Sequence, residues 1–272
     1  MVVPSLVTSR AGVPLAIEMF RQLGVAATID AQVLVKQRQR GLRASQLVES
    51  LVALWLAGGD RCQALSARLG YPLPAATTVR DFLEAFPADD LSPWQAGPKA
   101  AIPEESAPRP GLRQATRTLV TGLQQAAPVA TATLDVDATL LESHQDAATI
   151  AYAGTQGYQL VVVLWAEQDV ILHDEFRDGH VPAGCGNQRL LERAVAQLPA
   201  GITQLRLRGD HAPYETAVLR WYEAHGIAYA IRAARRVAAS SPVNQRVNRP
   251  RIERRGIGPP QAAAARASAC NM

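Results

Sequence analysis

The order of apolar patterns between residues 131 and 231 constrains the fold of this chain more than any other feature. Residues 131–137 alternate apolar and polar side chains, residues 158–165 form a nearly continuous apolar run, and residues 169–176 complete a hairpin pattern, so three strands are predicted. A helix, a strand, a second helix and a last strand are predicted to follow, over residues 188–198, 204–207, 214–225 and 227–231.

This order of elements predicts an α/β protein with a ribonuclease H-like mixed sheet and flanking helices, in which an antiparallel meander continues into parallel strands. In that topology the first and fourth strands lie side by side. Asp137 closes the first predicted strand and Asp210 directly follows the fourth. We therefore expect these two carboxylates to converge at one edge of the sheet.

Two carboxylates in one pocket repel each other unless a cation neutralises them, and oxygen ligands favour Mg²⁺ or Mn²⁺. Such ions support phosphoryl transfer. Either aspartate alone is equally typical of a turn, but their joint position favours Asp137 and Asp210 as catalytic metal ligands. Asp135 shares the face of Asp137, because side chains two apart on a strand point the same way, and it stays open as an alternative ligand or a supporting acid.

The first 90 residues predict a separate helical region. Helices are predicted over residues 13–23, 29–35, 44–57, 61–69 and 77–86. The last two, joined by a turn with Pro72 and Pro74, are compatible with a helix-turn-helix whose second helix would present Arg80 to DNA. A small helical bundle without DNA contacts is the alternative interpretation.

Composition divides residues 91–272 into three predicted segments. A Pro- and Ala-rich linker is predicted over residues 91–111, the catalytic core over residues 112–232 (opening with a helix at 112–126), and a basic, disordered tail over residues 233–272. The whole chain has a net charge of +4. The tail from Arg235 onward holds eight arginines and one acidic residue, so all of the basic excess lies there.

Several classes of protein are excluded by composition. No apolar run approaches the length of a membrane span, and the N-terminus lacks the pattern of a signal peptide. Three scattered cysteines do not make a disulfide framework. We therefore expect a cytoplasmic, nucleoid-associated protein without membrane contacts.

Several stretches in order resemble the DDE transposases of bacterial insertion sequences. They are LDVDATL (134–140), GYQLVVVLWAEQDVILHDEFRDG (157–179) and LRGDHAPYE (207–215), preceded by LWLAGGDRCQAL (54–65) and TTVRDFL (77–83). The resemblance implies DNA cleavage and strand transfer, a Mg²⁺ or Mn²⁺ cofactor held by Asp137 and Asp210, and DNA partners comprising the element's terminal repeats and target DNA. It also implies a homodimer in a synaptic complex.

One family feature has no counterpart here. The resemblance implies a third acid, a glutamate on a helix well beyond Asp210, and no residue of the remaining chain matches it. The chain is therefore expected to be truncated or frameshifted before that helix, with weak or no activity alone. Two alternatives stay open: a non-catalytic DNA-binding remnant, and a compact metal-dependent nuclease that recruits Glu142 or Glu215 as its third ligand.

Overall fold

The computed structural model describes residues 12–35, 41–59, 74–86, 93–97, 100–151, 154–210 and 215–232. All of these ranges belong to one compact unit, Met1–Ala233. The helix predicted over residues 61–69 and the tail predicted from residue 233 lie outside the described residues. Within the described ranges no helix is both long and apolar enough to cross a membrane.

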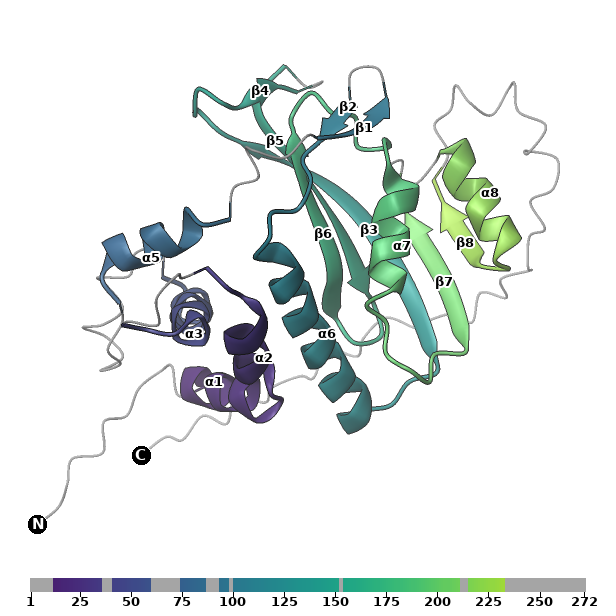
Figure 1. The fold of residues 1–272 in the computed structure, drawn as a ribbon. Helices are drawn as coiled ribbons and strands as arrows, with labels where there is room; N and C mark the ends of the chain where they lie inside the picture. The colour runs from purple at the N-terminus through teal and green to yellow at the C-terminus, as the bar shows by residue number, and fades with distance from the viewer. Residues whose placement is uncertain are drawn as a thin grey trace, which may run out of the picture. The chain divides into compact units, whose positions relative to one another are not determined.

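In the described residues, four helices precede the first hairpin (Figure 1): α1 Gly12–Gln22, α2 Val25–Gln32, α3 Ala44–Leu56 and α5 Ala76–Leu83. Their apolar faces pack together, since Val13 and Ile17 of α1 contact Leu54 of α3. A polar contact also joins α1 to α3, because the Arg21 side chain of α1 donates two hydrogen bonds to the Glu49 carboxylate of α3, at 3.0 and 2.6 Å. Four of the five helices predicted in this region are present in the described residues, and α2 begins and ends earlier than the predicted range of 29–35.

A short hairpin occupies part of the predicted linker. It consists of β1 Trp94–Gly97 and β2 Ala100–Ile102, which pair antiparallel. Ile102 is almost fully buried and packs with Val181 and Trp94, which explains why this Pro-rich stretch is ordered against the core. The helix that follows, α6 Arg109–Ala126, also begins within the predicted linker.

The sheet has the predicted ribonuclease H-like order. Its strands are β3 Thr131–Glu142, β4 Thr149–Ile150, β5 Gln156–Trp165, β6 Val170–Asp178, β7 Gln204–Gly209 and β8 Ala228–Ile231. β3, β5 and β6 form an antiparallel meander, and β7 and β8 pair in parallel on the other side of β3. The first and fourth long strands, β3 and β7, are therefore neighbours, as predicted.

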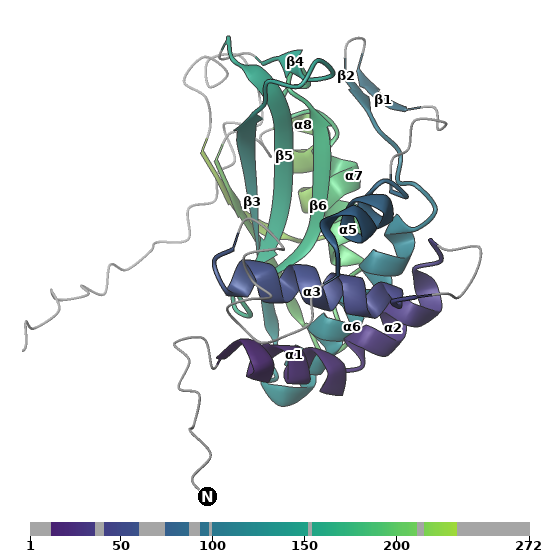
Figure 2. The same cartoon turned by 90° about the vertical axis from the view of Figure 1, so that its left-hand side faces the viewer.

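The helices of the core lie on one face of this sheet. α6 is joined there by α7 Asn187–Val195 and α8 Thr216–Ala224, and Figures 1 and 2 show these three helices to the same side of the strands. The main apolar core lies between them, with Val163 and Trp165 of β5 and Leu191 of α7 fully buried. Among the described residues no helix crosses the opposite face, which we call the bare face.

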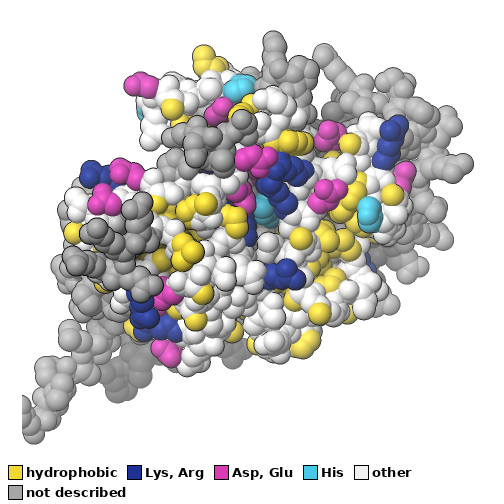
Figure 3. Space-filling model, viewed as in Figure 1, with side chains coloured by type: hydrophobic (Ala, Val, Ile, Leu, Met, Phe, Trp, Pro, Cys, Tyr) yellow, Lys and Arg dark blue, Asp and Glu magenta, His cyan; other side chains and the backbone are white. Residues whose placement is uncertain are grey.

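The helix-covered face is not a continuous basic surface. Figure 3 shows blue basic side chains on this face in small groups beside magenta acidic ones. The ion pairs of the region agree with that pattern, because Arg189 of α7 binds Glu104 at 2.7 Å and Arg193 lies 3.5 Å from the same carboxylate.

β3 is longer than its sequence pattern suggests. The alternation predicted a strand that ends at Asp137, whereas the structure continues it to Glu142. The reason is tertiary: β5 pairs with β3 as far as Gly157 opposite Glu142, so the hydrogen-bonded ladder extends the strand past its regular alternation. Asp137 therefore lies inside β3, a correction to its predicted position at the strand end.

Candidate functional site

Asp137 and Asp210 are the residues that follow the last pair of the β3–β7 ladder, Val136 with Gly209. The parallel ladder of these strands pairs Thr131 with Gln204 and continues residue by residue to Val136 opposite Gly209. Asp137 is the next residue of β3, and Asp210 is the first residue after β7. Side chains two apart on a strand share a face, so Asp137 lies on the face of Asp135, the bare face, because Leu134 and Val136 belong to the helix-covered core.

Both carboxylates are open to solvent. Asp137 is exposed, and its Oδ2 accepts a hydrogen bond from the hydroxyl of Thr139 at 3.3 Å. The Asp210 side chain is 61% exposed, and its Oδ1 lies 3.8 Å from Nε of Arg232, the residue that follows β8. Neither acid is buried in a closed cavity, so the site is an open edge that a large substrate can reach.

Asp135 has a partner of its own and is set apart from the other two acids. Arg208 lies directly opposite it in the ladder and donates from Nε to Oδ1 at 2.6 Å and from Nη2 to Oδ2. This hydrogen bonding and the charge of Asp135 raise the pKa of Arg208. The geometry makes Asp135 the acceptor of a bidentate arginine. That role differs from the alternative metal ligand that its position in the sequence left open.

The Arg208 contact was not identified from the sequence, although a signal for it exists. Arg208 and Asp135 are 73 residues apart, the separation that also relates Asp210 to Asp137. In a parallel ladder every pair of opposite residues has the same separation in the sequence. The shared separation of 73 residues therefore indicates that Arg208 lies opposite Asp135.

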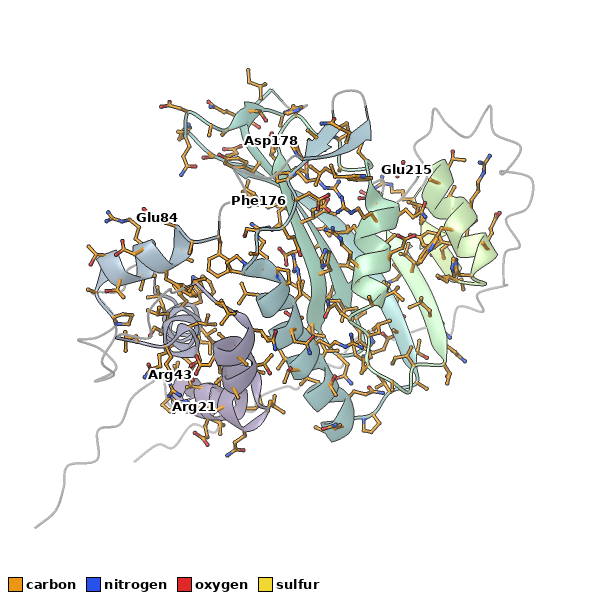
Figure 4. All side chains as sticks on the ribbon, viewed as in Figure 1. Arg21, Arg43, Glu84, Phe176, Asp178 and Glu215 are labelled. Carbon is orange, nitrogen blue, oxygen red and sulfur yellow. The ribbon has the colours of Figure 1, made fainter. Side chains whose placement is uncertain are left out.

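The two glutamates considered as third ligands lie elsewhere. Glu142 is five positions beyond Asp137 on β3, so strand alternation turns it to the opposite face. Glu215 precedes α8 on the helix-covered side, where Figure 4 labels it beside α7. Burial raises the pKa of Glu215, and the nearby charge of Arg177 opposes this effect. Among the described residues, no group of three or more His, Cys, Asp or Glu side chains could hold a metal ion.

The donor set of Asp137 and Asp210 nevertheless fits a hard cation. Mg²⁺ is commonly held by one or two carboxylates, with water and substrate phosphates completing its coordination. Asp137 and Asp210, both exposed and both one residue beyond the same ladder, are such a pair of donors. The arrangement can therefore bind Mg²⁺ or Mn²⁺ against a phosphate-bearing substrate.

Arg80, the predicted DNA contact, lies on α5 among acids of its own helix. It is 67% exposed, and its guanidinium lies 3.7 Å from Asp81 and 3.5 Å from Glu84. The two carboxylates outweigh its charge locally. The other helix of the predicted helix-turn-helix is outside the described residues, so the structure leaves this DNA contact a prediction.

Comparisons with known proteins give structural matches alone. No protein-family model and no curated protein matches the sequence. The piggyBac transposase synaptic complex with hairpin DNA is 10% identical, with a TM-score of 0.38, over 85% of this chain and 54% of that chain. The Mos1 mariner paired-end complex with Mn is 14% identical, with a TM-score of 0.28, over 78% of this chain and 65% of that chain.

A third structure, the Mos1 transposase paired-end complex with left transposon end, is 14% identical, with a TM-score of 0.27, over 71% of this chain and 61% of that chain. The chain thus spans between about half and two-thirds of the length of these structures.

Proposed function

We propose that this chain is a DDE-type DNA transposase that uses Mg²⁺ or Mn²⁺ to cleave and join DNA. The single observation that carries the proposal is the β3–β7 ladder, whose last pair, Val136 with Gly209, is directly followed by Asp137 on β3 and by Asp210 after β7. Two carboxylates at this point of a ribonuclease H-like sheet form the kind of site that two-metal phosphoryl transfer requires. The resemblance of LDVDATL and LRGDHAPYE to insertion-sequence transposases supports the same assignment.

In this proposal each residue of the site has a simple role. Asp137 and Asp210 hold the cation, and the hydroxyl of Thr139 orients the Asp137 carboxylate through its hydrogen bond. The cation, when bound, would activate water or a 3′-hydroxyl and stabilise the leaving oxygen of an in-line displacement. The substrates are the ends of a mobile element and target DNA, brought together by two copies of the chain in the nucleoid.

We further propose that the chain alone has weak or no activity. Among the described residues no group of three or more His, Cys, Asp or Glu side chains could hold a metal ion, and the nearby Asp135 is bound to Arg208. The same observation favours one second candidate, a DNA-binding protein that has lost catalysis. Sequence-specific binding of element ends without cleavage in Mn²⁺ would identify that candidate.

Mn²⁺ binding, followed by electron paramagnetic resonance, tests the site directly. Asp137→Asn and Asp210→Asn should each weaken Mn²⁺ binding at least tenfold, because even residues that merely orient metal ligands contribute about 10- to 100-fold. Asp146→Asn is the matched control, since Asp146 is an exposed aspartate in the loop after β3. Equal Mn²⁺ affinity in all three variants would show that Asp137 and Asp210 are not ligands.

Strand transfer in Mn²⁺ tests the activity. The full chain should join labelled element ends to target DNA weakly or not at all, and Asp137→Asn should remove any residual product. Strand transfer at the level of a complete transposase would overturn the proposal of an impaired enzyme. Residual strand transfer that survives Asp137→Asn would overturn the assignment of the site.

A further inference from the structure

The bare face carries a row of basic side chains next to the two aspartates. Arg206 and Arg208 are two residues apart on β7, so they point to the same face, that of Thr133 and Asp135 on β3. The bond between Arg208 and Asp135 of β3 confirms this orientation. Successive side chains on one face of a parallel strand are about 6.6 Å apart, a pitch comparable to that of neighbouring phosphates along a nucleic-acid strand.

These arginines keep donors available for an anion. Arg206 is exposed, and its Nη2 donates to Oε1 of Gln204 at 3.0 Å. No carboxylate in the described part of the chain lies within ion-pair distance of it. The Arg208 side chain is 60% exposed, and its bonds to Asp135 involve Nε and Nη2. The two hydrogens of its Nη1 are therefore free of that bidentate pair.

Asp135 gives Arg208 a fixed orientation. A guanidinium held at two nitrogens by one carboxylate cannot rotate freely, so its remaining donors keep one direction. An exposed ion pair contributes little to stability, typically up to about 1 kcal/mol. The pair of Arg208 and Asp135 is therefore better explained by the orientation that it gives to Arg208 for a ligand than by its contribution to the stability of the fold.

The helix-covered face offers no comparable row among its described residues. Arg113 and Arg189 of this face already face acids, since Arg113 pairs with Glu105 and Asp174, and Arg189 with Glu104. Figure 3 shows the resulting mixture of charges. On the bare face Arg208 lies near Asp135 and Glu167, whereas Arg206 has no ion-pair partner among the described residues. An extended backbone can lie along β7 there without meeting a described helix.

We propose that Arg206 and Arg208 bind the phosphates of a DNA strand that runs along β7 toward Asp137 and Asp210. The choice of DNA rests on the proposed function, whereas the contact with a phosphate backbone follows from the arginines themselves. Arg208 binds the phosphate nearer the two aspartates, and Arg206 binds the next one away from them.

The salt dependence of DNA binding measures such contacts. Removal of one arginine–phosphate contact should make the slope of log K against log salt concentration less negative by about 0.9 for duplex DNA. The probe is a fluorescein-labelled duplex of mixed sequence, titrated with the full chain in EDTA. Arg206→Gln should make the slope less negative by this amount and weaken DNA binding about fivefold to tenfold. Arg206→Lys should keep most of the parent's slope, because a lysine also neutralises a phosphate.

Arg220→Gln is the matched control. Arg220 is an exposed arginine of α8 on the helix-covered side, and no carboxylate in the described ranges pairs with it. The eight arginines of residues 235–272 add the same background to every variant. The double variant Asp135→Asn/Arg208→Gln tests the second contact without leaving an unpaired carboxylate, and it should also weaken binding.

The outcomes separate this proposal from the proposed function. If Arg206→Gln and Arg220→Gln give the same slope, the arginine row does not bind DNA. Suppose that Arg206→Gln, but not Arg220→Gln, makes the slope less negative, while Asp137→Asn leaves Mn²⁺ binding unchanged. The phosphate contact is then supported, and the proposed metal site is contradicted. Thermal melting of each variant shows whether weaker binding reflects unfolding; Arg206→Gln that melts like Arg220→Gln but binds less tightly supports the contact.

Discussion

Arg177 of β6 is a fully buried charge, and its three contacts explain how the fold accommodates it. Its Nε donates to the Glu175 carboxylate, Nη1 to the backbone carbonyl of Cys185 at 2.7 Å, and Nη2 to Oδ1 of Asn187 at 3.2 Å. Asn187 in turn donates to the carbonyl of Ala183 at 2.9 Å. A buried ion is tolerated when a counter-ion and hydrogen bonds satisfy it, so this cluster anchors the start of α7 to β6.

We predict that Glu175→Gln lowers the free energy of unfolding by about 3 kcal/mol, because it removes the hydrogen-bonded counter-ion of the buried Arg177 and leaves only the nearby charge of Glu215. Urea denaturation measures this decrease. The exposed pair of Arg80 and Glu84 supplies the control, and Arg80→Gln should cost about 0.5 kcal/mol or less. If Glu175→Gln and Arg80→Gln lowered the free energy of unfolding equally, the buried-pair argument would be contradicted. The double variant Glu175→Leu/Arg177→Met, which removes both charges, should lower the free energy of unfolding less than Glu175→Gln does.

At the scale of elements, α6 connects the N-terminal helices to the sheet. One side of α6 packs on α2, where Ala115 joins an apolar cluster with Ile29 and Val33. From the same helix Arg113 reaches Asp174 of β6. Close packing depends on Gly111, because a Cβ there would lie 2.5 Å from the carbonyl oxygen of Gln32.

Gly111→Ala should therefore destabilise the protein by about 1 to 3 kcal/mol, the usual cost of overpacking, despite the better helix propensity of alanine. Gly12→Ala is the control, since a Cβ at this helical glycine of α1 meets no atom of the described chain within 4 Å. It should leave stability unchanged or slightly raised. Chemical denaturation of both variants checks the pair, and a Gly111→Ala protein as stable as Gly12→Ala would refute the close approach of α2 and α6.

At the scale of the whole molecule, the sheet is protected on one face and open on the other. His173 of β6 lies on the protected side and is 2% exposed, and neither of its ring nitrogens has a hydrogen-bond partner among the described residues. Burial, together with the nearby charge of Arg113, lowers the pKa of His173 to about 3. The imidazole therefore stays neutral in the folded protein over the whole physiological range.

This burial makes global stability depend on pH. Below the unfolded pKa of about 6.5, the unfolded chain binds a proton that folded His173 rejects, so stability falls as pH decreases toward 3. From about pH 7 to about pH 5 the decrease due to this residue should be about 2 kcal/mol. His173→Leu should remove it, as measured by urea denaturation at both pH values.

His144→Gln is the matched control, because His144 is exposed in the loop after β3. This variant should retain the pH dependence of the parent. If His173→Leu also retained it in full, the neutral state of buried His173 would not be the cause.

The amino-acid sequence by itself determined the elements and their order. Strand alternation and helical spacing are local properties, so β3, β5, β6 and β7 could be predicted, and with them the neighbouring positions of β3 and β7. The candidate pair Asp137 and Asp210 followed from that order. The hairpin β1–β2 did not, since it is ordered by Ile102 packing on Val181 rather than by a local pattern.

Only the tertiary structure decided how these elements register and which face stays open. The alternation within one strand does not say which residue of another strand lies opposite, so the pairing of Asp135 with Arg208 and the extension of β3 past Asp137 required the ladders themselves. Burial of Arg177 likewise depends on Glu175, Cys185 and Asn187 meeting in space. The physical reason is that these contacts are set by long-range packing, which a short window of sequence does not contain.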